Sequence, residues 1–155
     1  MSDDILQVDQ KMHEMMKNLL AAPLLSRKNL KSIPPRGLYV FYEDGNPIYV
    51  GISGKNRMKD RIMGHSHKSG GPNSATFAFN IAKKDAEKKG INIKLSRPVL
   101  AKIPQFAELY TRSKERVSKM QIRVIEINNP NYRALFEIYA ALVLNTMEYN
   151  SFETH

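Results

Sequence analysis

Two tyrosines in neighbouring apolar runs are the first residues whose type and spacing could do chemistry. They belong to the tripeptides Gly-Leu-Tyr at residues 37–39 and Tyr-Val-Gly at residues 49–51, on either side of an Asp-Gly turn. Two phenols on one face of a hairpin could share a proton network and help to deprotonate a water. An unperturbed phenol has a pKa of about 10, so this chemistry needs a cation or a metal beside it. Alternatively, Tyr39 and Tyr49 are ordinary strand residues, because strands favour aromatic side chains.

Three charged or titratable residues further along the chain could complete such a site. Arg61 and His65 are four residues apart in a predicted short helix, where a guanidinium could stabilise negative charge developing on a phosphate. Glu137 lies on the narrow polar edge of a mostly apolar helix, and a carboxylate there is a natural oxygen ligand for Mg²⁺. The chain has no cysteine, which favours Mg²⁺ (or Mn²⁺) over zinc. Plain solvent exposure is the alternative explanation for all three.

The register of the hairpin decides whether the two tyrosines face the same way. A two-residue turn at residues 44–45 would scatter the aromatic side chains over both faces. A three-residue loop, with Gly45 in a left-handed bulge, places Tyr39 opposite Tyr49 and separates aliphatic from aromatic side chains. We expect the three-residue loop, because a slip of one residue mixes the two faces.

The elements around the hairpin follow from hydrophobic periodicity and from Gly and Pro punctuation. Helices are expected over residues 4–20, 56–65, 74–90, 104–120 and 129–147, and a third strand over residues 121–127. Ser74 is expected to cap its helix after a break at residues 70–73, and Gly90 to end it. This order predicts an α+β fold with a small, mostly antiparallel three-stranded sheet flanked by helices.

The length of 155 residues argues for a single domain, residues 1–155. Within it we expect an N-terminal helix and linker at residues 1–36 and an inserted basic helical segment at residues 66–120. No apolar run approaches the roughly 20 residues of a membrane span, and the acidic N-terminus is unlike a signal peptide. We therefore expect a cytoplasmic protein that does not act in a membrane.

Positive charge is concentrated in the middle of the chain. The whole chain carries 24 Lys and Arg against 15 Asp and Glu, a formal net charge of +9. Residues 54–119 hold 16 of these bases and 5 of the acids, a net of +11, so the remaining 89 residues carry −2. Solvated surface helices also collect lysine, but they usually balance it with glutamate. The imbalance therefore predicts a surface for a polyanion such as nucleic acid.

The order of these residues resembles the GIY-YIG nuclease superfamily. That family is named for two such tripeptides on a hairpin, which are followed by a helix with Arg and then His or Tyr four residues later. A metal-binding Glu on a later helix and an Asn after it complete the pattern. The resemblance covers residues 37–65 and 121–150, with Leu38 and Val50 in place of the isoleucines.

The resemblance implies a role for each matching position. Tyr39 would act as the general base or close to it, and Tyr49 would position this base and the phosphate. His65 would order the tyrosine network or the attacking water, while Glu137 would hold the metal and Asn150 would support the site by hydrogen bonding. Asn145 is the competitor to Asn150, and His67 and any lysine role of Lys55 stay open. The residues expected to contact the nucleic-acid backbone are Lys55, Arg57, Lys83, Lys84, Lys88 and Lys89.

Together these features predict a divalent-metal-dependent endonuclease that hydrolyses phosphodiester bonds in DNA. In this mechanism a Tyr-assisted water attacks the phosphate, a single Mg²⁺ on Glu137 holds the leaving oxygen, and Arg61 stabilises the charge. One alternative is a nucleic-acid-binding module that uses the basic helices without catalysis. The other is an α+β scaffold or protein-interaction domain whose match to the motifs is coincidental.

Overall fold

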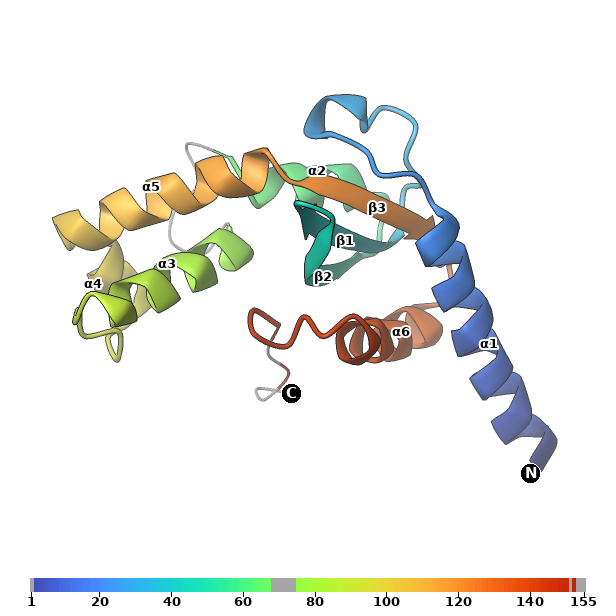
Figure 1. Cartoon of the computed structure of the whole chain (residues 1–155). Helices are drawn as coiled ribbons and strands as arrows, with labels where there is room; N and C mark the ends of the chain where they lie inside the picture. The colour runs from blue at the N-terminus through green and yellow to red at the C-terminus, as the bar shows by residue number, and fades with distance from the viewer. Residues whose placement is uncertain (1, 68–74, 151, 153–155) are drawn as a thin grey trace. The chain divides into compact units, whose positions relative to one another are not determined.

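A computed structural model of the chain describes residues 2–67, 75–150 and 152. The fold is α+β, as predicted, and contains a three-stranded antiparallel sheet together with helices (Figure 1). The chain forms two compact units: unit 1 is Met1–Lys59 with Gln121–His155, and unit 2 is Asp60–Met120. Among the described residues, no helix has both the length and the apolar surface that crossing a bilayer demands.

The sheet of unit 1 has the order β2-β1-β3, and both pairings are antiparallel. Its strands are β1 (Gly37–Glu43), β2 (Asn46–Ser53) and β3 (Gln121–Glu126), close to the predicted ranges. The central strand β1 is buried from Gly37 to Tyr42, whereas β2 and β3 are edge strands with partly exposed residues. The first tripeptide therefore lies in the middle of the sheet and the second on its edge.

Two helices cover the aliphatic face of the sheet. They are α1 (Ser2–Ala21) and α6 (Pro130–Val143), and their buried residues form one cluster with Leu38, Val40 and Val50. The Asn129 side chain caps α6 by accepting hydrogen bonds from two main-chain N–H groups of the first turn. α6 ends earlier than expected, because Asn145 has a φ of 57° and lies outside the helical region.

The hairpin does not have the predicted register. Asp44 and Gly45 have φ values of 51° and 80°, as a two-residue type I′ turn requires, and Glu43 pairs with Asn46. A β-bulge then shifts the register so that Phe41 pairs with Tyr49, while Tyr39 pairs with Gly51. The expectation that Tyr39 lies opposite Tyr49 is therefore wrong.

The aromatic and aliphatic side chains nevertheless lie on separate faces, as predicted. The turn and the bulge together displace the expected register by two residues, and a shift of two keeps each side chain on its face. Tyr39, Phe41, Tyr49 and Gly51 share one face, since each pairs directly with another of the four. Leu38, Val40, Val50 and Ile52 share the other face and belong to the aliphatic core or pack against it.

Unit 2 is helical and has an aromatic core. Its helices are α3 (Thr76–Lys88), α4 (Arg97–Ala101) and α5 (Pro104–Ser118), and α2 (Met58–Gly64) spans the boundary with unit 1. Phe79 of α3 packs against Phe106 and Tyr110 of α5, with ring centroids 5.0 and 5.3 Å apart. These contacts hold α3 and α5 together.

Most helix limits in this region agree with the periodicity. Gly90 follows the end of α3 and has a φ of 80°, as expected of a glycine that stops a helix. The expected cap at Ser74 and the break at residues 70–73 lie outside the described residues. The short helices α4 and η1 (Arg27–Asn29) were not predicted, because each is too short to show an apolar repeat.

Candidate functional site

Tyr39 lies on the central strand, and its side chain is fully buried. Its ring crosses the main chain of Gly51, its partner on β2. A Cβ at residue 51 would fall well inside van der Waals contact of the Tyr39 Cζ and Oη atoms. Tyr39 can therefore occupy this position only if residue 51 is glycine. This explains why the second tripeptide ends in Gly.

Tyr49 lies on the same face of the hairpin, where it pairs with Phe41 and not with Tyr39. Phe41 lies beside both rings, at 5.8 Å from Tyr39 in an edge-to-face arrangement and at 6.5 Å from Tyr49. Tyr49 is half-buried, so part of it remains exposed to solvent, whereas Tyr39 is fully covered. Of the two tyrosines, Tyr49 is therefore the one with surface that water or a ligand can reach.

Asn150 lies against the outer edge of β2. Its Oδ1 accepts a hydrogen bond from the Val50 N–H at 3.0 Å, and its Nδ2 donates one to the Val50 carbonyl at 2.8 Å. The Thr146 hydroxyl also donates to Oδ1, at 2.8 Å. The Asn150 amide therefore makes both of the main-chain hydrogen bonds that a neighbouring strand would make to Val50, the middle residue of the second tripeptide. Asn145, the competitor, is exposed at the end of α6.

Glu137 lies on α6 and is half-buried, next to the fully buried Phe136. The described residues include no group of three or more His, Cys, Asp or Glu side chains that could hold a metal. Mg²⁺ often uses only one or two protein carboxylates and completes its shell with waters and substrate phosphates. The single carboxylate of Glu137 fits such an open magnesium site and does not fit a closed one.

Arg61 and His65 belong to unit 2, and they differ sharply in exposure. Arg61 is exposed on α2, whereas His65 is buried and packs edge-to-face on Phe77 with ring centroids 6.3 Å apart. Burial, with a smaller effect from the Arg61 charge, lowers the pKa of His65 from 6.5 to about 4. At neutral pH the imidazole is uncharged, so His65 does not supply a positive charge there.

Lys55 and Arg57 lie in the exposed loop that follows β2. Lys55 and Asn56 both have positive φ, 55° and 58°, which is uncommon for two consecutive residues other than glycine. The Asn56 side chain accepts a hydrogen bond from Arg36 at 2.6 Å, and Arg36 also donates to Asn128 at 3.3 Å. Sequence reasoning did not single out Arg36, although it directly precedes the first tripeptide.

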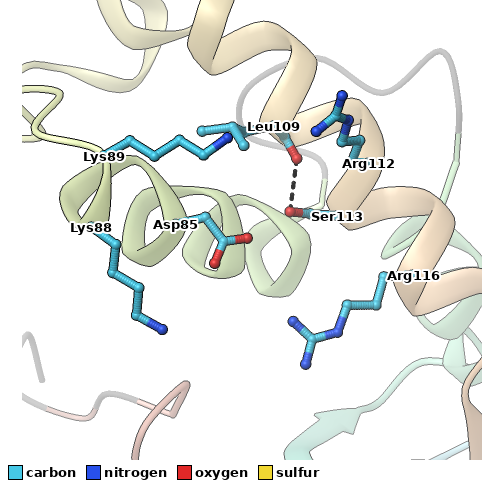
Figure 2. A pocket seen from close by; sticks show the side chains of 7 residues that line it. All are labelled: Asp85, Lys88, Lys89, Leu109, Arg112, Ser113 and Arg116. Atoms are coloured by element: carbon cyan, nitrogen blue, oxygen red, sulfur yellow. Dashed lines mark hydrogen bonds between the residues drawn. The ribbon is translucent and has the colours of Figure 1, made fainter.

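The four lysines expected to contact nucleic acid are not equivalent. Lys83 and Lys84 are half-buried, whereas Lys88 and Lys89 are exposed at the end of α3. The last two line a pocket of about 290 Å³ between α3 and α5 (Figure 2). The other residues that line it are Asp85, Leu109, Arg112, Ser113 and Arg116.

Sequence reasoning missed the contribution of α5 to this pocket. Arg112 and Arg116 are four residues apart, so both lie on one side of α5. This spacing is the signal in the sequence, but it does not reveal that α3 packs there. Another basic residue, Lys114, is buried over the Tyr110 ring at 4.2 Å, and desolvation lowers its pKa.

No protein-family model matches the chain, and no curated protein or solved structure matches it either. The likeness to the nuclease superfamily therefore depends on the residues described above.

Proposed function

We propose that the protein is a divalent-metal-dependent endonuclease of the GIY-YIG type that hydrolyses phosphodiester bonds in DNA. The observation that carries the proposal is the interlocking of the two tripeptides. Tyr39 occupies the space over Gly51, and Asn150 holds the main chain of Val50. Tyr39, Gly51, Val50 and Asn150 thus support one another in a single local structure, and Tyr49 beside them is partly exposed.

Within this proposal Tyr49 is the phenol that contacts the attacking water. It has exposed surface and Tyr39 has none, so the assignment differs from the expectation that Tyr39 is the base. Tyr39 is then a positioning residue that sets the aromatic face against Gly51. Glu137 would hold the Mg²⁺, which would supply a Lewis acid to stabilise the leaving oxygen. The catalytic roles of Arg61 and His65 stay predictions from the sequence.

A second candidate function is binding of nucleic acid without catalysis. It is favoured by the full burial of Tyr39, which removes one of the two phenols from contact with any ligand. It is also favoured by the basic pocket, which is formed by unit 2 alone. The two candidates share a partner and differ in whether the bound strand is cut.

Incubation of the purified protein with supercoiled plasmid and Mg²⁺ tests the proposal. We expect nicked or linear DNA, no product in EDTA, and no product with Glu137→Ala prepared in parallel. Equal degradation by wild type and variant would identify a contaminant and remove the nuclease proposal. Salt-sensitive binding without cleavage under any metal condition would establish the second candidate instead.

A further inference from the structure

The pocket between α3 and α5 has an unusual balance of charge. Four cationic side chains, Lys88, Lys89, Arg112 and Arg116, line it together with a single carboxylate, Asp85. Arg112 forms an ion pair with Glu108 at 2.6 Å, so part of its charge is already balanced. A hollow lined mainly by one sign of charge concentrates the electrostatic potential and attracts counter-ions of the opposite sign.

Stabilisation of the helix explains only part of this arrangement. Lys88 and Lys89 lie at the C-terminal end of α3, where a positive charge interacts favourably with the helix dipole and stabilises the helix. Arg116 lies in the last turn of α5, where the dipole of that helix favours its charge in the same way. The helix dipoles explain neither Arg112 nor the meeting of cations from two helices at one hollow. Asp85 and Glu108 offset part of this positive charge, and an anion bound among the four cations would lower their mutual repulsion further.

The arrangement of the side chains indicates where an anion would bind. Figure 2 shows Lys88 and Arg116 extending on the same side of the pocket, with the Asp85 carboxylate between them. Lys89 and Arg112 extend on the other side, next to Leu109. The volume of 290 Å³ equals about ten waters at roughly 30 Å³ each, which accommodates a phosphate with its sugar.

A second hollow adjoins the first and points to an extended ligand. It measures about 170 Å³ and shares Lys89, Leu109 and Arg112 with the larger pocket. Glu108, the ion-pair partner of Arg112, also lines it, so Lys89 is the cation expected to contact a phosphate there. An isolated ion would need only one hollow, whereas a strand presents phosphates at regular intervals along its length. Two adjoining hollows with shared cations fit consecutive phosphates of a single strand.

We propose that the pocket between α3 and α5 binds the sugar-phosphate backbone of a nucleic-acid strand, with Lys88 and Arg116 contacting one phosphate and Lys89 the next. This inference rests on the nucleic-acid partner of the proposed function, but it does not require cleavage. Asp85 repels the same phosphate and so limits the affinity, which allows the strand to be released. The contacts carry no sequence information, because they are made to the backbone alone.

The test is equilibrium binding of a fluorescein-labelled single-stranded 16-mer in EDTA, measured by anisotropy over a series of salt concentrations. We expect Lys88→Ala and Arg116→Ala each to weaken binding about threefold to tenfold and to reduce the salt slope by about 0.7. Asp85→Asn should tighten binding about twofold or more, because it removes the repelling charge. Lys94→Ala, at an exposed lysine outside both hollows, should leave the affinity unchanged.

Loss of a cation should weaken binding, whereas loss of the Asp85 charge should tighten it. Damage to the fold would weaken binding in every variant, so changes of affinity in opposite directions identify an electrostatic effect. Unchanged affinity and salt slope in Lys88→Ala and Arg116→Ala would overturn the proposal, as would weaker binding by Asp85→Asn. Binding of inorganic pyrophosphate without binding of the 16-mer would also overturn it, because the pocket would then serve a small phosphate ligand. If wild type binds as expected but never cleaves, the nuclease proposal fails while this inference stands.

Discussion

Asn150 and Val50 are 100 residues apart in the sequence and exchange two hydrogen bonds, one in each direction. All the groups involved are buried, so water cannot replace the amide if it is removed. The link fixes the edge strand that carries Tyr49 and Gly51 to the segment that follows α6. The position of the partly exposed Tyr49 therefore depends on Asn150, which is far away in the sequence.

Asn150→Ala should lower the free energy of unfolding by about 2–4 kcal/mol, because it leaves the Val50 N–H and carbonyl without partners. Urea unfolding followed by circular dichroism measures this loss. Asn145→Gly is the matched control at the competing asparagine. Its φ of 57° suits glycine, so the change should be neutral or slightly stabilising. Equal stability of Asn150→Ala and wild type would contradict the structural role given to the amide.

Gly51→Ala should destabilise the protein by about 3 kcal/mol or more, because the new methyl group would collide with the buried ring of Tyr39. The control is Gly54→Ala, where a Cβ meets only the flexible end of the Arg133 side chain. We expect the control to change stability by less than about 1 kcal/mol. Thermal unfolding midpoints rank the two variants, and Gly51→Ala should recover stability when Tyr39→Leu is added. A Gly51→Ala protein as stable as the control would be inconsistent with the ring position.

The sequence predicted which face of the hairpin carries the aromatic side chains but not which residues pair. Alternation along each strand is a local property, and it sorts Tyr39, Phe41 and Tyr49 onto one face. The pairing depends on the turn and on one extra residue in β2, where the bulge lies. A bulge has no reliable signature of its own, so the compensating shift could not be anticipated.

The buried histidine gives a prediction for the dependence of stability on pH. Its folded pKa of about 4 lies below the ordinary value of 6.5, so the unfolded chain binds more protons between these two pH values. Stability should therefore fall as the pH drops from about 6.5 to 4, by about 3 kcal/mol from this group alone. The free energy of unfolding, measured in urea, should differ less between pH 7 and pH 4.5 for His65→Leu than for wild type. His67→Gln, at an exposed histidine, should keep the wild-type difference. Equal pH dependence in wild type and His65→Leu would show that His65 is not the source.

The two tyrosines should respond differently to loss of the hydroxyl group. Tyr49→Phe should lower the single-turnover rate of DNA cleavage about a hundredfold, the lower range for loss of an acid–base group. Tyr39→Phe keeps the ring over Gly51 and should stay within about threefold of wild type. Both variants keep an aromatic ring, and their thermal midpoints, measured in parallel, separate a loss of activity from a loss of stability. A large loss in Tyr39→Phe with normal activity in Tyr49→Phe would return the water contact to Tyr39.

The candidate site was less predictable than the fold, for a physical reason. Residue types and their order singled out Tyr39, Tyr49, Glu137 and Asn150, but burial could not be read from them. The basic pocket depends on α3 packing against α5 through aromatic contacts, which only the three-dimensional structure reveals. The charge of residues 54–119 was therefore evident in the sequence, and its concentration in a pocket was not.

The proposed function requires a divalent metal, held by Glu137, for cleavage of nucleic acid. Its most direct test is the cleavage rate of a labelled DNA duplex across a Mg²⁺ titration, for wild type and for Glu137→Gln. Glutamine keeps the size of the side chain and removes the charge that attracts the cation. We predict a rate that rises and saturates with Mg²⁺ in wild type, and a loss of at least about a hundredfold in Glu137→Gln with an unchanged thermal midpoint. A Glu137→Gln protein that cleaves at the wild-type rate with the same Mg²⁺ dependence would contradict the claim.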